Sequence, residues 1–146
     1  MSRLRLDDFL PYQLSVASNA VSGAVAKAYV AHFGLRIPEW RLIAVLAEEE
    51  GLTQQALVAR TEMDKMTVSR AAAGLSERGL VSRVRHGSDG RSHALALSEA
   101  GRALYAQIAP KALAMEQELL KGLTAREIDA LKATLQKLKA ASHALR

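Results

Sequence analysis

The sequence contains no cysteine, and this absence removes several classes of site. Disulfide bonds, cysteine-ligated zinc and thiol-based redox sensing are all excluded. Aromatic residues make up only 4% of the 146 residues, so a core must be built from leucine, valine, isoleucine and alanine. Such a core favours closely packed helices over a β-sandwich. The hydrophobic content of 49% argues against a disordered chain.

The chain also lacks an uninterrupted apolar run of the kind that crosses a membrane or directs secretion. The first residues, MSRLRLDDFLP, become acidic before any long apolar run develops. The stretch 14–35 is rich in alanine and valine, but Asn19, Lys27 and His32 interrupt it. We therefore expect a buried helix in a soluble, cytoplasmic protein with no membrane partner. The length fits one domain, with or without helical extensions.

No constellation of catalytic or metal-binding residues stands out. The chain shows no Ser/His/Asp order, no paired catalytic carboxylates and no glycine-rich phosphate loop. His86 and His93 flank Asp89, but their spacing matches no metal-ligand pattern. The run Glu48-Glu49-Glu50 is interpreted as a solvated charge run at the end of a helix. We expect neither an enzyme nor a cofactor nor a metal site.

Hydrophobic periodicity and capping residues predict a mainly helical chain with one small hairpin. Pro110 lies inside the long fifth helix and predicts a kink or a break there. Thr124-Ala-Arg-Glu127 is a capping box that opens the last helix. The first four helices are expected near residues 10–34, 39–50, 54–60 and 64–78. Two strands are expected over 81–85 and 93–97, and the fifth helix begins after Ser98.

The net charge is +5, and its distribution matters more than its sum. Residues 60–97 carry seven basic and four acidic groups, a net +3, whereas residues 36–59 carry a net −2. Residues 98–146 also carry a net +3, but there the charges lie on long amphipathic helices and a solvated face explains them. The first basic block is the one that suits contact with phosphates.

The predicted helix over 64–78 has two distinct faces at a step of 100° per residue. One face is apolar and must point to the core: Val68, Ala71, Ala72 and Leu75. The opposite face carries Met66, Arg70, Ala73 and Glu77, and polar residues flank it near the start: Lys65, Thr67 and Ser69. Short side chains let such a helix enter a major groove about 12 Å wide, where an arginine can pair with guanine and a methionine can touch a thymine methyl.

The turn HGSDGRS, between the two predicted strands, has the properties of a DNA-binding wing. Gly87 and Gly90 permit a tight tip, and Asp89 can pair with and orient Arg91. A long cation at a narrow tip suits the minor groove of A·T-rich DNA. A solvated turn has the same residue types, but a reading helix followed by a wing in this order indicates a winged helix-turn-helix.

Three stretches resemble the multiple antibiotic resistance regulator (MarR) family of bacterial winged-helix repressors. They are FGLRIPEWRLIAVLAEEEGLTQQALVART, MDKMTVSRAAAGLSERGLVSRV and SDGRSHALALSEAG, which lie within residues 33–101. The resemblance implies a homodimer on a pseudo-palindromic duplex DNA operator, with residues 1–35 and 98–146 as the helical dimerisation region and 36–97 as the DNA-binding lobe. It also implies a small amphipathic or aromatic-acid ligand that lowers DNA affinity.

Candidate sites combine the resemblance with the residue chemistry. The DNA-binding candidates are Thr53, Gln54, Lys65, Met66, Thr67, Ser69, Arg70, Arg85, Asp89 and Arg91. The effector candidates are Tyr12, Trp40, Arg41 and Tyr105, although Trp40 can equally be a core residue. Exposed apolar residues at both ends of the chain predict the dimer contacts: Leu4, Leu6, Phe9, Leu10, Leu131, Leu135 and Leu138.

The chain departs from the family pattern at three places. Ile37 stands where the family often has a threonine or serine cap before the proline, and Ala56 replaces the acidic residue that would complete a capping box after Thr53. The run Ala71-Ala72-Ala73-Gly74 shortens the reach of the reading helix. Base reading is therefore expected to concentrate in residues 65–70. The alternative function is a winged-helix module that binds RNA or protein without a small-molecule effector.

Overall fold

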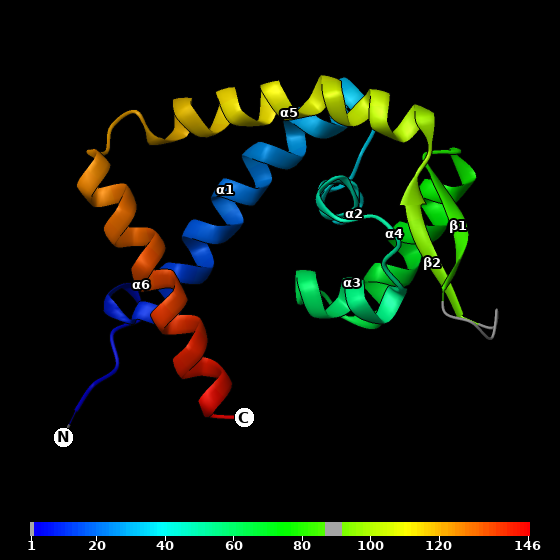
Figure 1. Cartoon of the computed structure of the whole chain (residues 1–146). Helices are drawn as coiled ribbons and strands as arrows, with labels where there is room; N and C mark the ends of the chain where they lie inside the picture. Colours follow the sequence, from blue (N-terminus) through cyan, green and yellow to red (C-terminus); the bar gives the residue numbers. More distant parts are fainter. Residues whose placement is uncertain (1, 87–91) are drawn as a thin grey trace. The chain divides into compact units, whose positions relative to one another are not determined.

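The structure is a computed structural model that describes residues 2–86 and 92–146 (Figure 1). It confirms a mainly helical fold with one two-stranded antiparallel hairpin, β1 and β2. The elements in chain order are the 3-10 turn η1 (Leu6–Asp8), α1 (Leu10–Phe33), α2 (Ile37–Glu48), α3 (Gln54–Thr61), α4 (Lys65–Glu77), β1 (Val81–His86), β2 (Ser92–Leu97), α5 (Glu99–Leu120) and α6 (Ala125–Ala144).

The chain forms two compact units, Met1–Ile108 and Ala109–Arg146. In the first unit, α2, α3 and α4 gather beside the hairpin around a core of aliphatic side chains (Figure 1). The most deeply buried of these are Leu35, Leu42, Ile43, Leu46, Leu57, Val68, Leu75 and Ile108. The core thus follows the expectation from the low aromatic content. The second unit contains the remainder of α5 and the whole of α6, which buries no residue.

Local capping residues end or begin most helices where the sequence predicts. Gly34 closes α1 with a φ of 64°, in the left-handed region that glycine tolerates. Thr53 and Asp64 cap α3 and α4 by accepting from the backbone N–H groups of Ala56 and Thr67. The Thr124/Glu127 capping box is present with both reciprocal hydrogen bonds, at 2.9 and 3.1 Å.

The start of α2 differs from the expectation. Its N-cap is Arg36, one residue before Ile37, because the backbone of Arg36 is extended while Ile37 is already helical. The Glu39 carboxylate accepts a hydrogen bond from the Arg36 backbone N–H at 2.9 Å. The helix therefore begins with an arginine at the capping position and Pro38 in its first turn, where a proline is tolerated.

The acidic run at the end of α2 is not merely solvated. Glu48 and Glu49 pair with Arg60 at the end of α3, at 2.8 and 3.0 Å, and Glu50 pairs with Arg102 of α5. These three ion pairs join the end of α2 to two other elements of the first unit. The prediction of a solvated charge run holds, since the three glutamate side chains are 53–67% exposed, and the fold adds their pairing with arginines that are distant in the sequence.

Two contacts connect α4 and the hairpin to the flanking helices. The Arg78 guanidinium donates to the carbonyl oxygens of Phe33 and Gly34, each at 3.2 Å, at the end of α1. A Cβ atom at Gly101 would lie 2.1 Å from the Leu80 carbonyl oxygen, so only glycine lets α5 approach the start of β1 this closely. The C-terminal end of α4 is therefore held by the end of α1, and the start of β1 is held by the close approach of α5.

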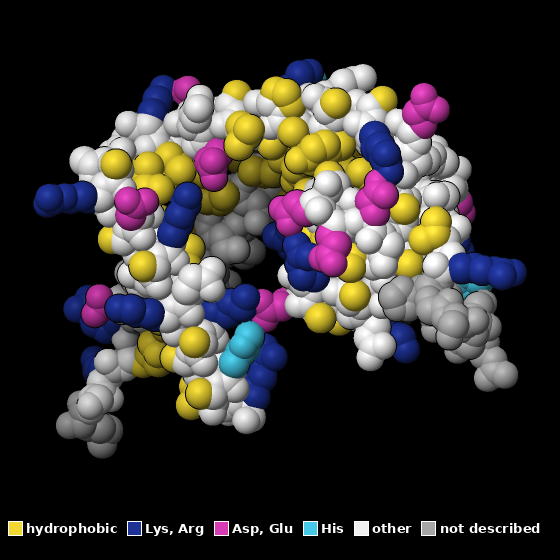
Figure 2. All heavy atoms as spheres, in the orientation of Figure 1, with side chains coloured by type: hydrophobic (Ala, Val, Ile, Leu, Met, Phe, Trp, Pro, Cys, Tyr) yellow, Lys and Arg dark blue, Asp and Glu magenta, His cyan; other side chains and the backbone are white. Residues whose placement is uncertain are grey.

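The stretch 14–35, predicted as a buried helix, forms α1 but is mostly exposed within one chain. Tyr29 is its only buried residue inside the helix, because α1 contacts few elements of the first unit. Figure 2 shows hydrophobic side chains at the surface of α5 and α6 as well. The exposed large hydrophobic residues of these two helices include Leu113, Leu119, Leu131 and Leu135. No helix among the described residues is long and apolar enough to span a membrane.

The helix α5 continues through Pro110 without a break. Proline lacks the N–H that would bond to the carbonyl four residues earlier, so one helical hydrogen bond is lost there. The remaining turns on both sides still form, and the predicted break does not occur.

Candidate nucleic-acid interface

The helix α4 buries the face that its sequence predicts. Val68, Ala71, Ala72 and Leu75 are buried, and α4 packs on both α2 and α3. Met66 is 64% exposed, and Ser69, Arg70 and Ala73 are also exposed. The polar face of α4 is therefore available to a partner, while its apolar face fixes its position in the lobe.

The first turn of α4 is organised by Asp64. The carboxylate accepts from the Thr67 backbone N–H at 2.8 Å and from the Thr67 hydroxyl at 2.9 Å. These hydrogen bonds, first from the backbone and then from the hydroxyl, lower the pKa of Asp64 because they stabilise its charged form. The Thr67 hydroxyl is thus engaged as a donor, and Lys65 and Met66 are the exposed side chains of this turn.

Close packing explains the small residues in the second half of α4. A Cβ atom at Gly74 would lie 2.7 Å from Oε2 of Glu39, a buried carboxylate of α2 that is only 6% exposed. Ala71 and Ala72 are buried against the same core. The small residues thus allow α2 and α4 to pack closely. Because their side chains are short, this half of α4 also extends little toward a partner molecule.

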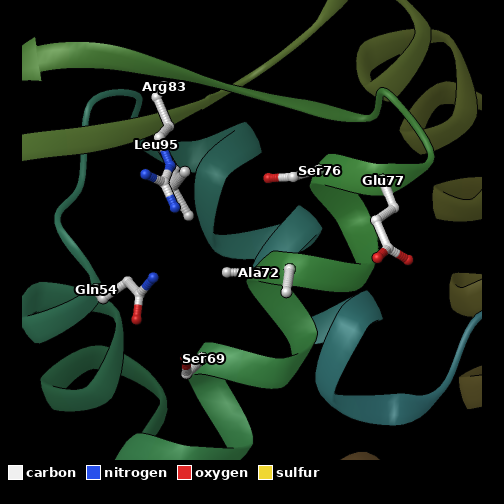
Figure 3. Close-up of a pocket in the computed structure, with 8 residues that line it drawn as sticks. Gln54, Ser69, Ala72, Ser76, Glu77, Arg83 and Leu95 are labelled. Carbon is white, nitrogen blue, oxygen red and sulfur yellow. The ribbon is translucent and has the colours of Figure 1, made fainter.

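A hollow of about 350 Å³ lies between α3, α4 and the hairpin (Figure 3). Arg83 extends into it from β1, across from Gln54 at the start of α3. Its floor and walls include Ser69, Ala72, Ala73, Ser76, Glu77 and Leu95. Gln54 also lines a second hollow, of about 410 Å³, together with Gln55, Val58 and Lys65. Gln54 thus borders both ends of the exposed surface of α4.

The hairpin places its arginines by strand alternation. Arg83 and Arg85 are two residues apart and therefore lie on the same face of β1. They pair in register with Leu95 and His93 of β2, respectively. The sequence predicted a DNA contact for Arg85 but not for Arg83, although strand alternation puts both side chains on the same face of β1. The predicted wing residues Asp89 and Arg91 lie outside the described residues.

Thr53 differs from the other predicted DNA contacts because it serves mainly as a cap. Its hydroxyl accepts from the Ala56 backbone N–H at 3.1 Å, and the side chain is half-buried. This bond occurs without the acidic partner that would complete a capping box. The Thr53 hydroxyl hydrogen is still available to an acceptor on the partner side.

An aromatic cluster brings together part of the predicted effector site. Trp40 stacks on Tyr105, with ring centroids 6.0 Å apart and an interplanar angle of 15°. Tyr29 also contacts Trp40, with ring centroids 5.3 Å apart in a tilted arrangement, and burial raises the pKa of the Tyr29 hydroxyl. The sequence reasoning missed Tyr29, which the helical period places on the buried face of α1.

Tyr12 does not join this cluster within one chain. It lies near the start of α1, whereas Tyr29 lies near its end, and the rise of a helix separates the two by roughly 25 Å. Tyr12 is 39% exposed. Arg41 is exposed next to Trp40 in the sequence. The length of α1 therefore keeps Tyr12 away from Trp40, although both were grouped as effector candidates by residue type.

Comparison with known proteins agrees with this geometry. Residues 33–92 match the model of the MarR family. The HTH-type transcriptional regulator TtmR of Methylorubrum extorquens (strain PA1) is 34% identical over 109 residues, which cover 71% of this chain and 56% of that protein. The chain thus spans little more than half of that relative's length.

Two solved structures extend the similarity over nearly the whole chain. A MarR/EmrR family transcriptional regulator from Acinetobacter sp. ADP1 has a TM-score of 0.88 and 28% identity, covering 96% of this chain and 99% of that one. CouR from Rhodococcus jostii RHA1, solved with p-coumaroyl-CoA bound, has a TM-score of 0.79 and 28% identity, covering 93% of this chain and 95% of that one. The similarity therefore includes α1, α5 and α6 as well as the central lobe.

Proposed function

Because the chain belongs to the MarR family of winged helix-turn-helix transcriptional regulators, we propose that it is a dimeric, sequence-specific repressor of a bacterial promoter. The observation that carries this proposal is the two-faced α4, which is anchored by four buried residues and exposes a polar and basic face. A helix held in this way can enter a major groove without rearranging the lobe.

In this proposal the side chains of α4 have different tasks. Arg70, near the middle of the exposed face, pairs with guanine O6 and N7, and Met66 touches a thymine methyl. Lys65 and Ser69 contact phosphates or base edges beside them, and the Thr67 hydroxyl, whose hydrogen is donated to Asp64, accepts from a base-edge donor. Contacts from Thr53, Gln54 and Arg85 flank the helix on the sugar–phosphate backbone, and Arg91, oriented by Asp89, enters the minor groove.

The dimer in this proposal uses residues 1–35 and 98–146. Their apolar side chains, such as Phe9, Leu10, Leu131 and Leu135, are exposed within one chain. Exposed apolar side chains in this number mark an association surface. A two-fold dimer would present two α4 helices to two half-sites of a pseudo-palindromic operator.

An effector is proposed at the aromatic cluster of Tyr29, Trp40 and Tyr105, with Arg41 as a cation for an acidic ligand. The stacked rings offer an apolar surface, and the relative CouR was solved with an aromatic acyl thioester bound. We expect salicylate-like aromatic acids to quench the fluorescence of Trp40, the single tryptophan, and to lower DNA affinity. If a broad panel of such acids leaves the fluorescence unchanged, Trp40 is a core residue only.

The experiment for the DNA-binding function is a selection of duplexes from a random pool, followed by a salt series. The wild-type chain should select an inverted repeat and lose affinity steeply as salt rises. Arg70→Ala should cost about 1–3 kcal/mol and relax the preference at one position in each half-site. Structured RNA of equal length is the competitor, and preference for RNA would favour the alternative function.

Arg91 provides the contrast within the same experiment. Arg91→Ala should weaken binding to many sequences alike and change only the preference for A·T-rich flanks, because the minor-groove pattern is nearly degenerate. Arg91→Lys should restore part of the affinity, whereas Arg70→Lys should restore less, since the bidentate fork is lost. An unchanged sequence preference in Arg70→Ala would contradict the placement of α4 in the major groove.

A further inference from the structure

A small hollow separates the start of α2 from the middle of α4. Its volume is about 170 Å³, and it is lined by Arg36, Pro38, Thr67, Arg70 and Ala71. Two of these five residues are arginines: Arg36 is the N-cap that precedes α2, and Arg70 lies in α4. Sequence reasoning assigned a role to Arg70 but none to Arg36, because Arg36 lies outside the reading helix and the hairpin.

Arg36 is held in place by Glu39. The Glu39 oxygen Oε1 accepts from the Arg36 backbone N–H at 2.9 Å and lies 3.5 Å from the Arg36 side-chain Nε. Among the described residues no acceptor is assigned to the two terminal nitrogens of this guanidinium, and the side chain is 66% exposed. Glu39 is buried, so its carboxylate is shielded from a partner molecule while it orients the arginine.

The chemistry of the hollow favours an anion with several acceptor oxygens. The Thr67 hydroxyl already donates to Asp64, so the donors that face the hollow are the guanidinium groups of Arg36 and Arg70. A guanidinium fork matches the geometry of a phosphate and binds it more strongly than a neutral donor does. The hollow adjoins the exposed face of α4, and elements beside a helix in the major groove lie over the sugar–phosphate backbone.

We propose that Arg36 binds a backbone phosphodiester of duplex DNA at this hollow, next to the base that Arg70 reads. This inference rests on the proposed function and adds a contact from α2 that fixes the register of the lobe on the duplex. Because a phosphate carries no sequence information, Arg36 contributes affinity and position, whereas Arg70 contributes the choice of base. The dimer has two such contacts, one in each half-site.

The test uses the full-length chain and the duplex that it selects from a random pool. Arg36→Gln should weaken binding roughly tenfold at physiological salt and lower the magnitude of the log–log salt slope by about two per dimer, one phosphate for each half-site. The loss should be equal for the selected duplex and for its single-base variants. Arg36→Lys should recover part of the affinity because the charge survives.

A matched control removes the same charge elsewhere. Arg126 lies on α6, outside the proposed DNA-binding lobe. The variant Arg126→Gln should therefore leave the salt slope within error of the wild type. Thermal melting of each variant separates a loss of folding from a loss of contact. A folded Arg36→Gln variant that behaves like Arg126→Gln would overturn the proposal, and so would one that changes sequence preference.

Neutral methylphosphonate linkages identify the phosphate itself. Substituted one position at a time in both half-sites, they should weaken wild-type binding at several positions, and at one of these positions Arg36→Gln should be insensitive. Sensitivity at every position in Arg36→Gln would contradict the contact. If the wild-type chain selects no duplex at all, the proposed function fails first, and this inference fails with it.

Discussion

The DNA-binding lobe and the terminal helices use similar aliphatic residues in opposite ways. In the lobe, Leu42, Leu46, Leu57 and Leu75 are fully buried within one chain. In α6, by contrast, Leu131 and Leu135 are exposed and no residue is buried, although α6 has a complete capping box. Helix formation in α6 is thus specified locally, but the burial of its apolar stripe requires a second surface.

The difference shows that the two regions depend on different sources of stability. The lobe buries its aliphatic side chains within one chain, whereas the apolar side chains of the terminal helices stay exposed there and, in the proposed dimer, would be covered by a partner chain. Changes in the lobe should therefore alter the free energy of unfolding, and changes in the terminal helices should alter the association constant.

The largest effect should come from charges on the apolar stripe of α6. Leu131→Glu with Leu135→Glu should raise the dimer dissociation constant by at least ~100-fold, because each buried leucine contributes about 1.5–3 kcal/mol and a buried charge adds a further cost. Light scattering over a concentration series measures the effect. Removal of residues 1–10 and 128–146 should likewise give a monomer.

The control places the same charge on the other side of α6. Ala133 lies about 160° around the helix from Leu131, so Ala133→Glu should leave the dimer intact. A folded, full-strength dimer in the double leucine variant or in the truncated chain would contradict the assignment of these segments to the interface.

The second effect compares one substitution in both regions. Gly101→Ala should lower the free energy of unfolding by about 3 kcal/mol, because the new Cβ would lie 2.1 Å from the Leu80 carbonyl oxygen and the hairpin must shift. Gly122→Ala, between α5 and α6, meets no atom within 4 Å in the chain and should stay within about 0.5 kcal/mol of the wild type. Urea unfolding measures both, and equal values for the two variants would refute the close approach.

The third effect concerns the contact between the lobe and α1. Arg78→Ala removes two hydrogen bonds to the carbonyl oxygens of Phe33 and Gly34 and should cost about 1 kcal/mol of stability. Arg78→Lys should recover only part of it, since one ammonium group does not reproduce the guanidinium fork. Chemical denaturation tests this, and an unaltered midpoint in Arg78→Ala would mean that the guanidinium does not stabilise the end of α1.

The smallest effect is the acid dependence of the α4 cap. Hydrogen bonds from Thr67 lower the pKa of Asp64 in the folded chain, so its contribution to stability is present above the unfolded value near 3.8 and is lost as the pH falls through the lower folded value. Asp64→Asn keeps a capping residue but does not titrate. Its melting temperature should approach that of the wild type below pH 3.8, and a constant difference at every pH would argue against this linkage.

Most of the fold could be predicted from the sequence because its signals are local. Gly34, Thr53, Asp64 and the Thr124/Glu127 pair act within one helical turn, and each begins or ends a helix where expected. The faces of α4 follow from a period of 3.6 residues and were confirmed for all four core positions. The start of α2 was missed by two residues, because the helix was expected from residue 39 and begins at Ile37, after Arg36, which is an unusual N-cap.

The candidate site was predictable only in part. The exposed residues of α4 were found from periodicity, but Arg83 and Arg36 were not, because their places beside α4 depend on how the hairpin and α2 pack against it. The effector list grouped Tyr12 with Trp40 by residue type, whereas the length of α1 separates them and brings Tyr29 to Trp40 instead.

The sequence by itself determined the helices, the hairpin, the two faces of α4 and the family, because caps, periods and motifs act over a few residues. Only the tertiary structure decided the ion pairs of Glu48 and Glu49 with Arg60 and the Arg78 contact with the end of α1. It also decided the close approach of α5 to Leu80 that requires a glycine at position 101. These contacts join residues that lie 11 to 45 positions apart in the sequence and belong to different elements. No local rule specifies which side chains a packed core brings together.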